Sequence, residues 1–434
     1  MMLSSWQSVL RHSGRCWLSR TAVVALLVAT GAAGHAKTYE VMLQGFHWRS
    51  HEVPGGWYNI LIQNKDRIKS ASFTLIWFPP PSDSASPQGY LPRQLYNLNS
   101  RYGSVDQLRR AVQSMKPEVK PLADIVINHR VGTADWADFT NPNWNTTTIA
   151  RDDEVDIPNK SINNDTGDGY KHGRDLDHLN PKAIKGIQSW MLYLKNNIGF
   201  EGWRYDMVKG YRGSAIKDYN DITKPVFSVG EFWDFNPQMI VNWIDSTHPQ
   251  WQKSATAFDF PLREIIYQAV VNKNYHWLKY MDKLPGVVGL WPDKTVTFVE
   301  NHDTEEARGG ENGVPAFPDD NRMLQGYAYI LTHPGTPSVF WRDIFDNSAS
   351  NASKLTTMIR IRKEYGINSE SKVFIAKAEH GNGYAAYIQG DKGEVAMKIG
   401  PGTWSPSGPK WDGTADLLLS DPDFAIWGEK GWLR

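Results

Sequence analysis

The chain has one cysteine in 434 residues, Cys16, and carries no excess of either charge, with 47 basic and 47 acidic residues. A single cysteine cannot form an intrachain disulfide. The fold must therefore be stabilised by a large core, by bound metal, or by both. A protein that binds nucleic acid would show a basic excess, so we expect no nucleic-acid partner.

Long apolar runs are also missing, since none reaches the length of about 20 residues that a membrane-spanning helix requires. Near the N-terminus, three arginines precede a run of small and apolar residues over 21–34, which ends in Gly34-His35-Ala36. This pattern is typical of a secretory signal peptide. We expect residues 1–36 to be removed and the protein to be secreted, extracellular or periplasmic, without membrane contact. An uncleaved N-terminal anchor is the alternative.

Aromatic residues are abundant, with 19 Trp and 18 Tyr. They could be polar-tipped side chains at the edges of a large core, or platforms that stack against sugar rings. The chain is 41% hydrophobic and 22% charged, which is typical of a folded soluble protein and excludes intrinsic disorder.

Eight short β-rich apolar runs alternate with longer helical patterns. The runs are Val41–Phe46, Phe73–Phe78, Leu122–Ile127, Gly202–Tyr205, Val226–Val229, Ala257–Phe260, Val296–Val299 and Ser338–Phe340. One helical pattern starts at Asn180-Pro181, a favourable helix start, and repeats apolar residues every three or four positions as far as Ile198. Eight such alternations predict a closed parallel (β/α)₈ barrel over residues 37–366.

Two stretches interrupt the alternation. Residues 129–178 form a long polar insert between the third strand and its helix, which is typical of a functional excursion. Residues 367–434 follow the last predicted helix, 351–365, and contain short alternating runs that predict a small antiparallel β domain. These runs are Val373–Ala376, Tyr384–Ile388 and Val395–Ile399.

The predicted strand ends are strongly polar. Catalytic groups of a (β/α)₈ barrel lie at the C-terminal ends of its strands. Asp206, Glu231 and Asp303 stand at three such ends, which we expect to be neighbours, with Arg204 and His302 beside them. Like charges held together raise one another's pKa, which fold stability alone would not favour. The pattern therefore indicates an active site.

At this point the sequence resembles the α-amylase family, glycoside hydrolase family 13, and most closely its plant-type members. The segments that carry the resemblance are Leu43–Phe46, Gly55–Tyr58, Asp124–Arg130, Asp177–Asn180, Phe298–Asp303 and Gln325–Gly335. The resemblance implies a monomer that hydrolyses internal α-1,4-glucosidic bonds of starch, glycogen and related α-glucans with retention, through a covalent glycosyl-enzyme.

The resemblance also implies roles for the acids. Asp206 matches the nucleophile, Glu231 the general acid/base, and Asp303 the third acid, which holds sugar hydroxyls. Retaining glycosidases need two carboxyls about 5–5.5 Å apart. Arg204 can keep the nucleophile ionised, while burial and nearby anions should keep Glu231 protonated.

Further residues match sugar contacts of the family. His129 and His302 match histidines that hydrogen-bond the sugar at the cleavage site, although core histidines are the alternative. Tyr90 matches the aromatic residue that stacks on that ring, and Trp233 and Lys209 match contacts on the leaving-group side.

The insert carries eight acidic residues against three basic ones between positions 152 and 177. A solvated acidic loop is one interpretation. A calcium site is the other, because Ca²⁺ takes six to eight oxygen ligands. By resemblance, the ligands are the side chains of Asn128, Asp165 and Asp175 and the main-chain carbonyls of Asp168 and Gly210.

The chain departs from the plant pattern in two places. Tyr205 and Met207 flank Asp206 where leucine and phenylalanine are usual, and Leu290 replaces one of two adjacent tryptophans that grip starch granules. Other functions stay open: an exo-type enzyme that forms maltooligosaccharides, a transglycosylase of the same family, or a non-catalytic glucan-binding protein.

Overall fold

The computed structural model describes residues 37–133, 136–248, 254–305, 315–411 and 415–429. The predicted signal peptide, residues 1–36, lies outside the described residues. Within the described ranges, no helix combines the length and the apolar character needed to cross a bilayer.

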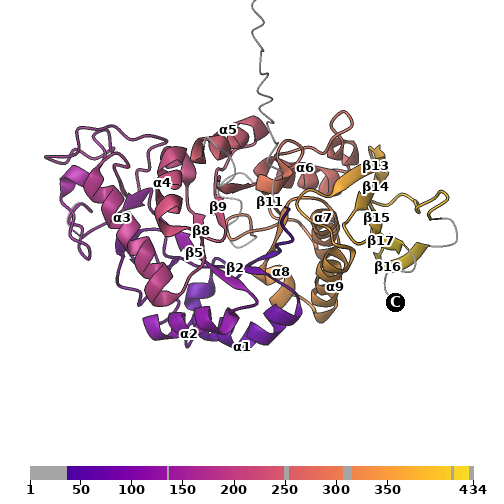
Figure 1. The fold of residues 1–434 in the computed structure, drawn as a ribbon, viewed down its shortest axis with the longest axis horizontal. Helices are drawn as coiled ribbons and strands as arrows, with labels where there is room; N and C mark the ends of the chain where they lie inside the picture. The colour runs from indigo at the N-terminus through magenta and orange to yellow at the C-terminus, as the bar shows by residue number, and fades with distance from the viewer. Residues whose placement is uncertain (1–36, 134–135, 249–253, 306–314, 412–414, 430–434) are drawn as a thin grey trace, which may run out of the picture. The chain divides into compact units, whose positions relative to one another are not determined.

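Eight parallel strands form a closed barrel, as predicted, and each overlaps one predicted run (Figure 1). The strands are β1 (Met42–Gln44), β2 (Leu75–Phe78), β5 (Lys120–Ile125), β8 (Gly202–Tyr205), β9 (Ser228–Gly230), β10 (Thr256–Phe258), β11 (Thr295–Phe298) and β12 (Thr336–Phe340). Strand β1 pairs with both β2 and β12, which closes the ring. Nearly every residue of these strands is buried, because one face packs inside the barrel and the other against helices.

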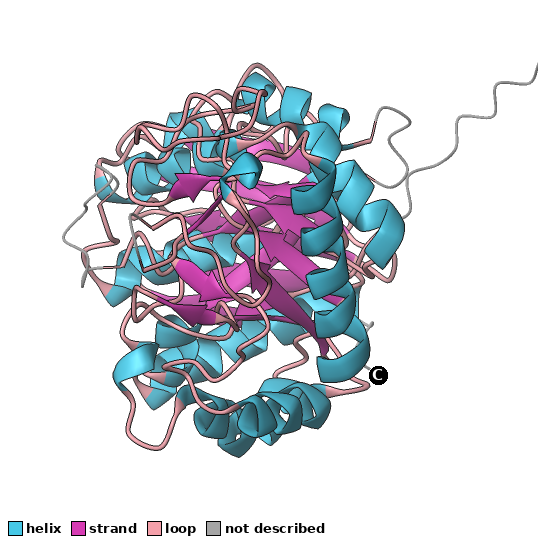
Figure 2. Ribbon diagram, turned by 90° about the vertical axis from the view of Figure 1, so that its left-hand side faces the viewer, coloured by secondary structure: helices cyan, strands magenta, loops and turns pink. Residues whose placement is uncertain are grey.

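Helices surround the strands (Figure 2). They are α1 (Trp57–Ser70), α2 (Val105–Met115), α3 (Pro181–Tyr193), α4 (Gly213–Thr223), α5 (Pro237–Thr247), α6 (Phe260–Val271), α7 (Asp320–Thr332), α8 (Trp341–Phe345) and α9 (Ala349–Tyr365). The Asn180 side chain caps α3 by accepting hydrogen bonds from the main-chain N–H groups of Lys182 and Ala183. The helix predicted to reach Ile198 does so through a final π-helical turn, Leu194–Ile198, and ends at Gly199, whose φ of 103° favours glycine.

The two ends of the insert pair with each other at the point where the insert leaves the barrel and re-enters it. Strand β6 (His129–Arg130) pairs with β7 (Arg174–Asp175), which sets His129 opposite Asp175. The Arg130 guanidinium is buried and donates to the main-chain carbonyls of Arg93 and Pro142 at 2.7 and 3.0 Å. This ladder and this guanidinium fix both ends of the insert beside the C-terminal end of β5.

The C-terminal segment forms the predicted antiparallel sheet, with five strands in the order β13-β14-β15-β17-β16. Strands β13 (Lys372–Glu379), β14 (Gly383–Gln389) and β15 (Glu394–Ile399) match the predicted runs. The hairpin of β16 (Ala415–Asp421) and β17 (Phe424–Glu429) was not predicted, because the run Leu417–Leu419 shows no apolar–polar alternation. The sheet contacts α7 and α9 (Figure 1).

Candidate active site

Strands β8 and β9 place two of the predicted acids. Asp206 directly follows β8 and Glu231 directly follows β9. The main-chain N–H of Asp206 donates to Ile125 O at 3.1 Å, and that of Glu231 donates to Tyr205 O at 3.0 Å. The parallel ladder therefore continues to each acid, and both side chains stand at one end of the barrel.

Asp303 reaches the site differently. It follows β11 on a loop, and β10 lies between β9 and β11 in the barrel. The prediction that all three acids stand on neighbouring strand ends is therefore wrong for Asp303. The Asn301 side chain fixes the loop, because its Oδ1 accepts from the N–H groups of Asp303 and Thr304, both at 2.9 Å.

Arg204 lies beneath the acids and is 1% exposed. Its Nη1 contacts Asp206 Oδ1 at 2.7 Å and Asp124 Oδ1 at 2.9 Å, and its Nη2 contacts Glu231 Oε1 at 2.8 Å. One cation cannot neutralise three buried carboxylates, so at least one carboxyl should retain its proton near neutral pH.

The acids differ in how strongly they hold a proton. Burial raises the pKa of Glu231 to about 8 and that of Asp206 to about 7, while the Arg204 charge lowers both. The charges of Asp206 and Asp303 contribute to the raised pKa of Glu231. The two carboxyls contact one guanidinium and therefore titrate as a coupled pair, in which one can hold the proton that a general acid needs while the other is ionised.

His302 is fixed in one orientation by both ring nitrogens. Gln44 Nε2 donates to His302 Nδ1 at 2.9 Å, so the ring proton lies on Nε2. That nitrogen is 2.7 Å from the Tyr90 hydroxyl and 3.3 Å from Asp303 Oδ2. The Tyr90 hydroxyl in turn donates to Asp124 Oδ2 at 3.0 Å. These bonds connect the histidine to the carboxylates around Arg204.

A cavity of about 960 Å³ lies over these groups. Every predicted catalytic or sugar-binding residue lines it except Arg204, which lies underneath. Sequence reasoning missed several further lining residues: Trp48, Tyr170, His172 and Phe235. Trp48 and Phe235 stand four and five residues beyond the ends of β1 and β9, so the strand-end argument could have found both, whereas no motif marks Tyr170 or His172.

Each of the remaining predicted sugar contacts, His129, Lys209 and Trp233, also contacts another group of the protein. His129 Nε2 is 2.8 Å from Tyr90 O, and the imidazole is buried. Lys209 Nζ forms an ion pair with Asp234 at 2.8 Å, and the Trp233 ring stacks on Phe260 at 4.6 Å. Trp233 and Lys209 still line the cavity and are available to a ligand.

The predicted metal ligands include oxygen atoms without partners. Among the described residues, Asn128 Oδ1 and Asp165 Oδ2 are buried and accept no hydrogen bond. Gly210 passes so close that a Cβ there would lie 1.8 Å from Asn128 Oδ1. The N–H of Asp168 donates to Lys209 O at 2.9 Å, which joins the insert to the turn after β8.

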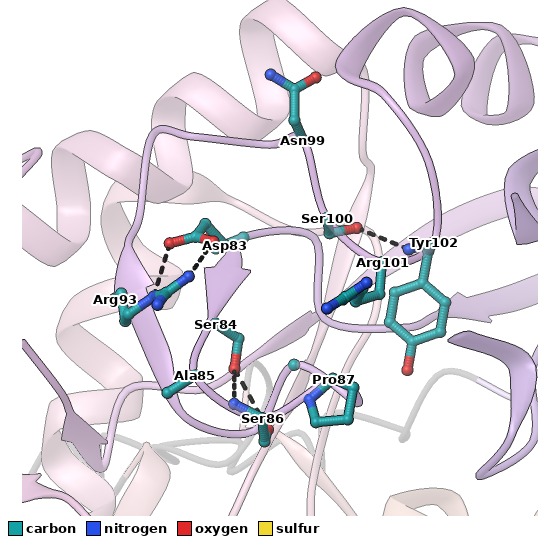
Figure 3. Close-up of a pocket in the computed structure, with 12 residues that line it drawn as sticks. Asp83, Ser84, Ala85, Ser86, Pro87, Arg93, Asn99, Ser100, Arg101 and Tyr102 are labelled. Carbon is teal, nitrogen blue, oxygen red and sulfur yellow. Dashed lines mark hydrogen bonds and ion pairs between the residues drawn. The ribbon is translucent and has the colours of Figure 1, made fainter. Parts of the chain in front are cut away.

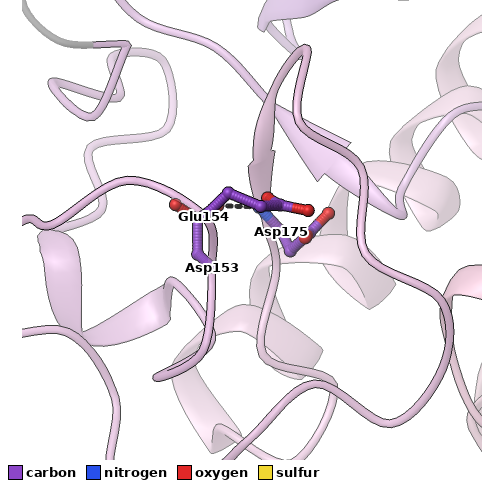
Figure 4. Close-up of side chains that lie close together, drawn as sticks. All are labelled: Asp153, Glu154 and Asp175. Carbon is purple, nitrogen blue, oxygen red and sulfur yellow. Dashed lines mark hydrogen bonds between the residues drawn. The ribbon is translucent and has the colours of Figure 1, made fainter.

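Acidic side chains gather around Asp175 (Figure 4). Asp153, Glu154 and Asp175 each place an oxygen within 4.8 Å of the others. Asp153 already accepts from Arg174 and from the N–H of Asp175, but burial raises the pKa of Asp175 to about 8 and that of Asp165 to about 7. Buried acids that lack a counter-charge suit a hard divalent cation. Sequence reasoning missed Glu154.

A second cavity, of about 410 Å³, lies in the hairpin segment after β2 (Figure 3). Its wall includes the ion pair between Asp83 and Arg93, with Nη2 2.8 Å from Oδ1, and the side chain of Arg101. No predicted site residue lines it.

The C-terminal sheet and the chain as a whole both resemble known proteins. Residues 364–428 match the family described as "Alpha-amylase C-terminal beta-sheet domain". Over 91% of its length the chain is 37% identical to "Alpha-amylase 3, chloroplastic" of Arabidopsis thaliana, but it spans only 45% of that protein. Over 89% of its length it is 37% identical to "Probable alpha-amylase 2" of the same plant, and it spans 94% of that protein.

The fold is shared with solved structures. A crystal structure of an alpha-amylase from Geobacillus thermoleovorans, complexed with acarbose, superposes with a TM-score of 0.68 at 16% sequence identity. The match covers 91% of this chain and 98% of that chain, so the likeness includes both the barrel and the C-terminal sheet.

Proposed function

The chain belongs to the α-amylase family, and from this we propose that it hydrolyses internal α-1,4-glucosidic bonds of starch, glycogen and related α-glucans. The observation that carries the proposal is the contact of one buried guanidinium, Arg204, with both Asp206 and Glu231 at the floor of a large cavity. Stacked rings on the cavity wall, such as Tyr90 on His302, suit a sugar ring.

The reaction that these residues support has two steps. Asp206 attacks the anomeric carbon while Glu231 gives its proton to the leaving oxygen, and a glycosyl ester forms on Asp206. Glu231, now a carboxylate, takes a proton from water, which attacks the same carbon and releases Asp206. Arg204 stabilises the carboxylate form of both residues, and Asp303 is placed to hold sugar hydroxyls.

The short distances to Arg204 support retention of configuration. Its two Nη atoms share one carbon, so the carboxylates of Asp206 and Glu231 lie close to one another. A small separation, about 5–5.5 Å, leaves no room for water between the carboxyls and favours attack by the enzyme itself. Inverting enzymes need a wider gap.

We further propose that calcium binds at the base of the insert. The side chains of Asn128, Asp165 and Asp175 and the carbonyls of Asp168 and Gly210 would hold it. The unpartnered oxygens of Asn128 and Asp165 support this proposal. A bound ion supplies positive charge to buried carboxylates and ties the insert to the turn after β8.

Residues 1–36 are proposed to direct secretion and then to be removed. Their composition, with three arginines before a short apolar run, supports this. N-terminal sequencing of protein recovered from the periplasm or the medium should start at Lys37. Protein that retains residues 1–36 in a membrane fraction would contradict the proposal.

A timed digest of soluble starch tests the activity. Internal cleavage should lower viscosity early and give products of many lengths, and proton NMR of fresh product should show the α-anomer first. Products of a single length from the start would indicate the exo-type enzyme, and products longer than the substrate would indicate the transglycosylase. No products at all would leave a glucan-binding protein.

A further inference from the structure

The insert contributes a stack of rings to the cavity wall. The Tyr170 ring lies parallel to the His129 imidazole, with centroids 4.0 Å apart and planes at 22°. His172 packs edge-on against Tyr170 at 5.4 Å and 67°. All three residues line the cavity that contains the acids.

His129 itself offers little surface to a ligand, since it is 2% exposed. Its Nε2 faces the Tyr90 carbonyl at 2.8 Å. Gly173 packs against the ring so closely that a Cβ there would lie 2.9 Å from His129 Cδ2. The Tyr170 ring stacks against the imidazole as well. The imidazole therefore presents only a small edge to the cavity, and Tyr170 is the more accessible ring of the pair.

The backbone holds Tyr170 in this place. Its N–H donates to Asp175 Oδ2 at 3.0 Å, and its carbonyl accepts from the N–H of Gly173 at 3.2 Å. Asp175 is paired with His129 in the β6–β7 ladder. A half-buried aromatic ring that is fixed in advance loses little conformational freedom when a ligand stacks on it.

We infer that Tyr170 is a sugar-contacting residue that sets the affinity of the cavity for its glucan, in addition to the contacts proposed for the barrel residues. The inference rests on the proposed function. The ring supplies an apolar face to the C–H groups of a glucose unit, and its hydroxyl supplies a donor and an acceptor at the edge. Trp48, Tyr90 and Trp233 supply aromatic surface from the barrel.

Binding to a non-hydrolysing form tests the inference directly. Tyr170→Ala, Tyr170→Phe and Tyr280→Ala would each be combined with Asp206→Asn, and maltoheptaose affinity measured by isothermal titration calorimetry. Tyr170→Ala should weaken binding about tenfold, which corresponds to one well-packed ring contact. Tyr170→Phe keeps the ring and should stay within about threefold. Tyr280 is 65% exposed and does not line the cavity, so Tyr280→Ala is the matched control.

Two results would overturn the inference. Affinity of Tyr170→Ala equal to that of the control would show that the ring does not touch the sugar. Tighter binding would show that Tyr170 only covers His129. Thermal melts check that each variant is folded. If Tyr170→Ala melts at a lower temperature than the control, Tyr170→Leu replaces it, because leucine still covers His129 but has no aromatic face. If the unsubstituted protein neither binds nor cleaves glucan, the proposed function fails instead.

Discussion

Arg204 contacts Asp124, Asp206 and Glu231 from a fully buried position, and its charge lowers the pKa of all three. Asp124 also accepts from the indole N–H of Trp77 at 3.0 Å. Asp124 therefore holds the guanidinium from below while the two proposed catalytic acids face the cavity. A substitution of either catalytic acid therefore leaves Arg204 held in place by Asp124.

Asp206→Asn should abolish turnover and leave binding largely intact. The amide cannot form the glycosyl ester, so kcat should fall by about 10⁴-fold or more. Asp245→Asn makes the same change at an exposed site on α5 and should keep full activity. Initial rates on soluble starch and maltoheptaose affinity measure the two properties. Activity of Asp206→Asn within tenfold of the unsubstituted enzyme would show that Asp206 is not the nucleophile.

The pH profile of kcat/KM should be bell-shaped. Asp206 must be ionised, so activity should rise with pH as Asp206 loses its proton. Glu231 must be protonated, so activity should fall above its pKa of about 8. Steady-state rates between pH 4 and 10 test this. Glu231→Gln should lose most activity, and its remaining activity should no longer fall at alkaline pH. Full activity of the unsubstituted enzyme at pH 10 would contradict the acid role of Glu231.

The position of the insert depends on a small set of polar contacts. A two-residue ladder, the buried Arg130 and the bond from Asp168 to Lys209 O hold it to the barrel. Burial raises the pKa of Asp175, and the charge of the half-buried Asp165 raises it as well. The ladder fixes the ends of the insert, and the proposed calcium ion would add positive charge to its interior.

Chelation should therefore destabilise the protein. A ligand that binds only the native state adds about 4 kcal/mol at a thousandfold excess over its Kd. EDTA should lower the melting temperature by several degrees, and added calcium should restore it. Magnesium should restore it poorly, because Mg²⁺ requires a tighter octahedral shell. Differential scanning calorimetry measures each step.

Two substitutions distinguish the loss of a proposed calcium ligand from the loss of any negative charge in the insert. Asp175→Ala should lower the melting temperature without chelator and remove the response to calcium. Asp156→Ala removes an exposed carboxylate from the same insert and should change neither property. If EDTA and Asp175→Ala both leave the melting curve unchanged, the insert is a solvated acidic loop.

Across the whole described chain, the barrel and the C-terminal sheet share buried polar contacts. His333, at the end of α7, directs Nδ1 to Tyr329 O at 2.9 Å and Nε2 to the Tyr384 hydroxyl of β14 at 2.8 Å. Burial lowers the pKa of His333 to about 3, so the ring stays neutral. Lys354 of α9 adds an ion pair with Asp421 of β16 at 2.7 Å. The sheet is therefore a part of the same folded unit.

Tyr384→Phe should destabilise the protein by about 1–3 kcal/mol, because it leaves the buried Nε2 of His333 without a donor. Urea unfolding, followed by tryptophan fluorescence, measures the loss. Tyr387→Phe on the same strand removes a hydroxyl that lies nearer the surface and bonds Ser407, and it should cost much less. Equal costs for the two variants would mean that the His333 bond does not contribute to the interface.

The sequence alone determined the features that depend on local pattern. Short β-rich apolar runs located all eight barrel strands, and Asn180-Pro181 located the start of α3, because propensity and capping act over a few neighbouring residues. Strand-end polarity located Asp206 and Glu231 at the end of the barrel where they lie. Resemblance then supplied their roles, which spacing could not.

Only the tertiary structure decided which distant side chains meet. Tyr170 stacks on His129 and His302 bonds Gln44, although 41 and 258 residues separate these pairs. Strand β10 separates Asp303 from the other acids, and β16 pairs with β17 without any alternating pattern. The barrel fixes the ends of each loop, and the loops then place distant side chains in contact. Local sequence preferences act over a few residues and do not specify these long-range contacts.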